Sequence, residues 1–129
     1  MTPELTILTL AALWQVVHFA LYSVTAQRQV GPKYAASPRD TPRQLTGIAG
    51  RAQRAMTNHF EGLILFAIAT LTLTYADKTG DTTAMLAALY LAARLLYLPA
   101  YLLGWTPWRS LIWAPGFGAT VALLILALI

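Results

Sequence analysis

Residues 5–26 read LTILTLAALWQVVHFALYSVTA and contain no acidic residue, lysine or arginine. A run of this length reaches the roughly 20 apolar residues that a helix needs to cross about 30 Å of hydrocarbon. No lysine or arginine precedes the run, whereas a cleaved secretory signal normally begins with positive charge. We therefore predict a retained transmembrane helix over residues 5–26.

The rest of the chain has the same character. Of its 129 residues, 57% are hydrophobic and only 11% are charged, and the mean hydropathy is +0.57. Soluble domains contain about 25% charged residues, and disordered segments combine low hydrophobicity with high charge. The composition therefore excludes both classes and predicts one all-α integral membrane domain over residues 1–129.

Three further apolar stretches follow, at residues 46–75, 82–103 and 110–129. They are separated by segments containing proline, glycine and charged residues, which favour loops. Four spans of about 20 residues use nearly the whole chain, so we predict a four-transmembrane-helix bundle whose chemistry lies on or between the spans. The absence of cysteine excludes thiolate metal sites, and His18 and His59 have no partner histidine at metal-ligand spacing. We predict no metal.

The charge distribution predicts an orientation. The first connection contains four of the nine cations, Arg28, Lys33, Arg39 and Arg43, whereas the second contains Lys78 alone. Cytoplasmic loops are enriched in lysine and arginine, so the first and third connections should be cytoplasmic and both termini outside. Topology and anionic lipid head groups then account for the net charge of +4, and we predict no nucleic-acid partner.

Polar residues form two stripes inside the spans. At about 100° per residue, four polar residues of residues 46–75 fall within an arc of about 80°, and four of residues 82–103 fall within an arc of about 60°. The first stripe consists of Arg51, Arg54, Asn58 and Glu61, and the second of Tyr90, Arg94, Tyr97 and Tyr101.

An arginine or aspartate in the middle of a span costs roughly 2.5–3.5 kcal/mol, so such residues face protein or water and find partners. We predict that the two stripes face each other across a pocket open to the cytoplasm, with a Glu61–Arg94 ion pair at its floor. Arg28, Arg51 and Arg54 should line the mouth. The surplus of positive charge predicts an anionic ligand, because guanidinium groups suit carboxylates. The competing interpretation is that the ion pair sets helix register and that the arginines extend to head groups.

Residues 51–61, RAQRAMTNHFE, and 94–101, RLLYLPAY, resemble the MAPEG family, the membrane-associated proteins in eicosanoid and glutathione metabolism. The segment VGPKYAASPRD at residues 30–40 is similar to the bacterial branch of that family. The resemblance implies a homotrimer in the bacterial inner membrane that holds glutathione at subunit interfaces near the cytoplasmic side. Its implied glutathione contacts are Arg54, Asn58, Glu61, Arg94, Tyr97 and Tyr101.

In active members of the family a further arginine, just after the third helix, stabilises the glutathione thiolate. Its position here corresponds to Trp108, and Arg109 follows one residue later. We predict that Arg109 has this catalytic role. Gly62 stands where some eicosanoid-making members have tyrosine, which argues against eicosanoid synthesis.

Two functions follow from the resemblance. The first is a glutathione-dependent membrane transferase or peroxidase acting on lipophilic electrophiles or lipid hydroperoxides that enter from the bilayer. The alternative is a non-catalytic membrane module that binds glutathione, another small anion or a lipid head group. A third possibility, an anion carrier, is disfavoured because the sequence lacks the repeat that many transporters show.

Overall fold

The computed structural model describes residues 1–129 as five helices without β-strands. Four of the helices are long and apolar enough to cross a membrane, which confirms the predicted all-α, four-helix membrane fold. The helices are α1 (Pro3–Val30), α2 (Pro32–Ala36), α3 (Gly47–Tyr75), α4 (Asp81–Leu102) and α5 (Trp108–Leu128).

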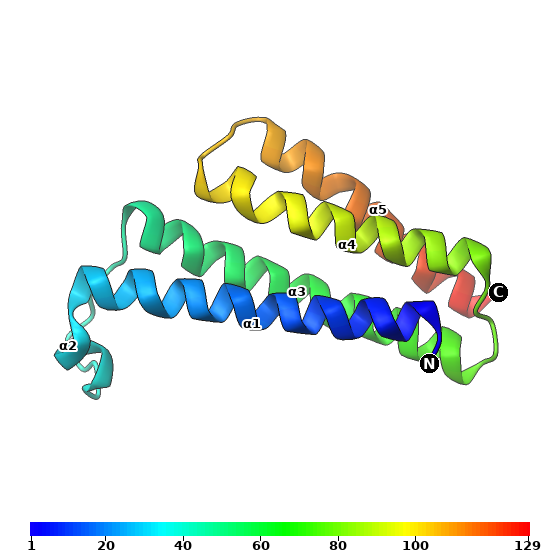
Figure 1. The fold of residues 1–129 in the computed structure, drawn as a ribbon, viewed down its shortest axis with the longest axis horizontal. Helices are drawn as coiled ribbons and strands as arrows, with labels where there is room; N and C mark the ends of the chain where they lie inside the picture. The colour runs from blue at the N-terminus through cyan, green and yellow to red at the C-terminus, as the bar shows by residue number, and fades with distance from the viewer.

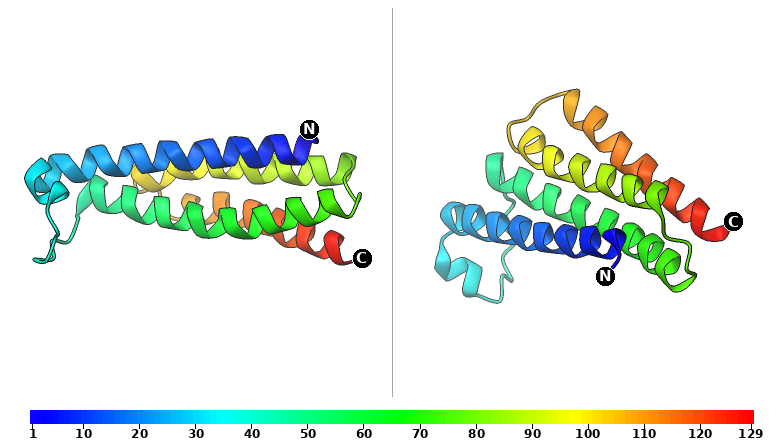
Figure 2. Two further views of the ribbon diagram at one scale, coloured as in Figure 1. Left: turned by 90° about the horizontal axis from the view of Figure 1, so that it is seen from below. Right: turned by 45° about the vertical axis from the view of Figure 1, so that its right-hand side comes forward.

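The four long helices alternate in direction (Figure 1). Helix α1 lies beside α3, and α4 lies beside α5, so that the two pairs form the bundle. Both termini lie at the end where α3 turns into α4, and the α1–α3 and α4–α5 connections lie at the opposite end. The two further views in Figure 2 show the same arrangement. The beginning of α3 and the end of α4 therefore lie at the same end of the bundle.

The predicted span boundaries agree with the helices within two residues at every end except the end of α1. This helix continues to Val30 because no helix-breaking residue occurs before Gly31. Gly31 has φ +87°, a backbone conformation that glycine adopts readily, and Pro32 then begins the short helix α2. The sequence did not predict α2, which lies in the region expected to be a loop.

Small side chains dominate the interior of the bundle. Ala11, Ala69 and Ala87 are buried, and the Phe66 and Tyr90 rings stack with their centroids 3.9 Å apart. Larger apolar side chains such as Val16 point outward. In a membrane protein lipid can cover such side chains, and helices approach one another closely through small residues. The helices therefore pack closely around the polar groups described below.

Candidate functional site

A groove of about 390 Å³ lies between α3 and α4, in the part of the bundle nearer the α4–α5 connection. Seven residues line it, and five of them belong to the two predicted polar stripes. The lining consists of Gln53, Arg54, Thr57, Asn58, Glu61, Tyr97 and Tyr101. Part of each predicted stripe therefore lines one groove, three residues from α3 and two from α4.

Helical spacing explains this gathering. Arg54, Asn58 and Glu61 follow one another at steps of four and three residues, which places them on one face of α3. Tyr97 and Tyr101 are likewise one turn apart on α4, and their ring centroids lie 5.5 Å apart. Arg54 Nε donates a hydrogen bond of 3.0 Å to Tyr101 Oη, which ties the two faces together.

Arg109 lies beside this groove. A smaller hollow of about 220 Å³ shares Asn58 and Tyr97 with the groove and is also lined by Arg109 at the beginning of α5. The guanidinium carbon of Arg109 lies 4.9 Å from the centroid of the Tyr101 ring. This cation therefore lines a hollow that adjoins the groove at Asn58 and Tyr97.

Arg94 is buried behind the groove, where it does not pair with Glu61. Its side chain is only 4% exposed, and its Nη1 donates a hydrogen bond of 2.7 Å to Asn58 Oδ1. Glu61 is exposed and makes no hydrogen bond or ion pair within the chain. The predicted Glu61–Arg94 ion pair is therefore wrong for the single chain.

Arg94 reaches Asn58 rather than Glu61 because of the shape of α3 around Gly62. Around the helix, Gly62 lies about 40° to one side of Asn58, and Glu61 lies about 60° to the other side. Gly62 has no side chain, and a Cβ atom there would overlap the guanidinium group of Arg94. The arginine thus packs against the backbone at Gly62 and reaches Asn58, leaving Glu61 on the open side of the groove.

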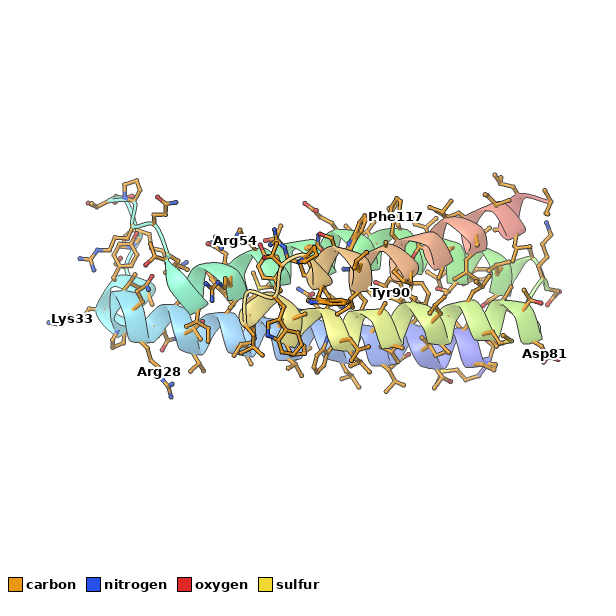
Figure 3. All side chains as sticks on the ribbon, turned by 90° about the horizontal axis from the view of Figure 1, so that it is seen from above. Arg28, Lys33, Arg54, Asp81, Tyr90 and Phe117 are labelled. Carbon is orange, nitrogen blue, oxygen red and sulfur yellow. The ribbon has the colours of Figure 1, made fainter.

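Two predicted arginines do not line the groove. Arg51 Nη1 donates a hydrogen bond of 3.1 Å to the carbonyl oxygen of Leu102, so it joins the beginning of α3 to the end of α4. Arg28 is exposed in the last turn of α1, and Figure 3 shows it projecting away from Arg54. Within one chain, neither of these side chains belongs to the site.

The site also contains residues that the sequence did not reveal. Gln53 and Thr57 directly precede Arg54 and Asn58 and are one turn apart, so their polarity and spacing could have identified them. Ser110 and Trp113 line the hollow near Arg109 because of how α5 packs, and no sequence signal points to them.

The sequence model of the MAPEG family matches residues 5–129. No curated protein and no solved structure matches the chain. The family match covers all four long helices, including the two that line the groove.

Proposed function

The chain belongs to the MAPEG family, and from this premise we propose that it is a membrane enzyme that uses glutathione as its co-substrate. The proposed reaction is transfer of glutathione to a lipophilic electrophile or reduction of a lipid hydroperoxide. Membership of the family supports a membrane protein of glutathione or eicosanoid metabolism. The choice of reaction rests on the groove between α3 and α4.

One observation carries the proposal: Arg54 and Glu61 are both exposed in the groove, two helical turns apart on one face of α3. Arg54 uses Nε to bond Tyr101, so its two terminal nitrogens remain available to a ligand. Glu61 has no partner in the chain. Glutathione offers carboxylates to the arginine and an ammonium group to the glutamate, and ionised pairs of this kind form the stronger hydrogen bonds.

Arg109 supplies the proposed catalytic charge. A cation close to a thiol favours the thiolate, which is the nucleophilic form. In the transfer reaction the thiolate would attack the carbon of an electrophile and expel a leaving group such as chloride. In the peroxidase reaction it would attack the hydroperoxide, giving an alcohol and glutathione sulfenic acid, which a second glutathione converts to the disulfide and water.

The exposed charges also support the proposed homotrimer. Glu61 lies in the middle of α3, and a charged side chain facing lipid there would cost roughly 2.5–3.5 kcal/mol. A neighbouring copy covering this face would remove that cost. Arg28 points away from the groove of its own chain, so in our proposal it contributes to the site only through another subunit.

We place the protein in the bacterial inner membrane, with both termini outside and the groove open toward the cytoplasm. The distribution of lysine and arginine supports this orientation. The groove lies in the half of the bundle that contains the basic α1–α3 connection. Glutathione would therefore enter from the aqueous side and the lipophilic partner from the bilayer.

The proposal is tested with purified protein in detergent. Adding glutathione should produce the ultraviolet absorbance of its thiolate, and a chlorinated aromatic acceptor should be conjugated. Arg109→Ala should remove the thiolate signal and reduce turnover at least tenfold, because the stabilising cation is lost. Arg39→Ala, on the exposed α1–α3 connection, is the matched control and should change neither. Full activity of Arg109→Ala would overturn the catalytic role.

A second candidate is a non-catalytic module that binds glutathione, another small anion or a lipid head group. The observation that favours it is Trp108, which stands where active members of the family have their arginine. This candidate predicts that glutathione raises the melting temperature, that Arg54→Ala and Glu61→Ala abolish the rise, and that no thiolate signal appears. The thiolate measurement separates the two functions.

A further inference from the structure

A second polar cluster is buried behind the groove, between α1, α3 and α4. His18 and His59 are only 2% and 0% exposed, although neither was predicted to belong to a site. Buried polar groups in a span are costly unless they are satisfied. The cluster comprises Trp14, Gln15 and His18 from α1, His59 from α3 and Arg94 from α4.

The members of this cluster form a continuous series of contacts from α3 to α1. Nδ1 of His59 lies 2.7 Å from Oε1 of Gln15, and because an amide oxygen only accepts, His59 donates this bond. The imidazole ring of His59 stacks on that of His18 at 4.6 Å. His18 in turn donates from Nδ1 to the carbonyl oxygen of Trp14 at 2.9 Å, and the Trp14 ring packs edge-on against it at 5.6 Å.

The cluster reaches the groove through Arg94. Nε1 of Trp14 donates a hydrogen bond of 3.3 Å to the backbone carbonyl oxygen of Arg94. The side chain of Arg94 then donates to Oδ1 of Asn58, which immediately precedes His59 on α3. Two consecutive residues of α3 are therefore held by different helices, His59 by Gln15 of α1 and Asn58 by Arg94 of α4.

This arrangement decides which end of the Asn58 amide the ligand meets. Since Arg94 occupies Oδ1, the amide NH₂ group is the end left to the groove, which Asn58 lines. An NH₂ group selects a carbonyl or carboxylate oxygen of the ligand and disfavours a donor. The amide would otherwise be free to rotate and accept as well as donate.

We propose that Trp14, Gln15, His18 and His59 are positioning residues of the glutathione site. Trp14 holds α4 at the backbone carbonyl of Arg94, and Gln15 and His18 hold His59 on α3, so that Arg94 meets Asn58 and Asn58 presents its NH₂ group to an acceptor oxygen of the ligand. A supporting set of locked side chains of this kind is what keeps a binding group in its productive geometry. The inference rests on the proposed function for the identity of the ligand, but not for the arrangement of the cluster.

The first test uses Trp14→Phe, which removes the indole N–H and keeps an aromatic ring. Its matched control is Trp105→Phe, on the exposed α4–α5 connection. The loss of one hydrogen bond predicts a dissociation constant for glutathione raised about 2- to 10-fold by isothermal titration calorimetry in detergent. The control should bind as the parent protein does.

The second test follows Arg94 without any ligand, by the Nε–H resonance of protein labelled with ¹⁵N-arginine. Trp14→Phe and His59→Leu should shift or broaden this resonance, and His59→Asn, whose amide can donate to Gln15, should restore it. Trp14→Phe and His59→Asn keep the test decisive if His59→Leu does not fold. An unchanged resonance in Trp14→Phe would overturn the positioning role, whereas failure of the parent protein to bind glutathione would overturn only the proposed function.

Discussion

At the scale of single residues, Gly62 controls where Arg94 lies. A Cβ atom at Gly62 would overlap the guanidinium group, and this group is buried and already bonded to Asn58. We predict that Gly62→Ala displaces the guanidinium and breaks this bond, because the added Cβ atom would occupy the space of its Nη2 and Cζ atoms. Binding of glutathione should weaken about 10-fold, as the loss of a hydrogen bond to a charged group implies.

The matched control for this prediction is Gly118→Ala. Gly118 also lies inside a long helix, and an added Cβ would meet nothing within 4 Å. Calorimetric titration of both variants in detergent separates a local overlap from a general effect of alanine in a helix. Equal affinities in Gly62→Ala and Gly118→Ala would show that Arg94 does not depend on Gly62.

The sequence was enough to predict which residues of α3 share a face, but not which residues of other helices they contact. Spacing along one helix was enough to place Arg54, Asn58 and Glu61 on a common face. Spacing does not reveal how α3 is rotated against α4, and this rotation decides that Arg94 meets Asn58 rather than Glu61. The contacts of His59 were missed for the same reason, because its partners lie on α1, far away in the sequence.

At the scale of helices, a buried contact joins the beginning of α1 to the beginning of α4. Glu4 is fully buried, and one of its carboxylate oxygens accepts a hydrogen bond from the hydroxyl of Thr83. The same hydroxyl accepts the backbone N–H of Gly80 at 2.8 Å, just before α4 begins. Thr83 therefore fixes the first turn of α4 and holds the buried carboxylate at once.

Thr83→Val keeps the shape of this side chain and removes its hydroxyl. Both hydrogen bonds are lost and the buried carboxylate of Glu4 is left unsatisfied, so we expect stability to fall by about 1–3 kcal/mol. Thermal unfolding in detergent should show this as a lowered melting temperature. Thr82→Val, at the exposed neighbouring position, should leave the melting temperature unchanged. Equal melting temperatures would mean that the contact contributes nothing.

At the scale of the whole molecule, composition and hydropathy were sufficient to predict the class of fold. A bilayer requires helices of a defined length, so the number of spans and their boundaries could be read from apolar runs such as residues 5–26. The packing of those spans could not be read in the same way. Small buried residues such as Ala69 and Ala87 fix how closely the helices approach, and they look alike in sequence whether they face lipid or protein.

The orientation of the molecule gives a further prediction, because the two ends of the bundle differ in charge. The α1–α3 connection contains two arginines and a lysine, whereas the α3–α4 turn contains Lys78 with two aspartates nearby. The chain has no cysteine, so single cysteines can be introduced as unambiguous probes. Gln44→Cys and Ala76→Cys place exposed probes at the two ends.

Labelling with a membrane-impermeant maleimide should then depend on the sidedness of the membrane vesicles. Cytoplasmic loops retain positive charge, so in right-side-out vesicles we expect Ala76→Cys to react and Gln44→Cys to be protected. Inside-out vesicles should give the reverse pattern, and detergent should make both probes reactive. If Gln44→Cys reacts only in right-side-out vesicles, the groove between α3 and α4 opens away from the cytoplasm. Because the cytoplasm is where we expect glutathione to be supplied, that result would contradict the proposed route of the co-substrate along with the orientation.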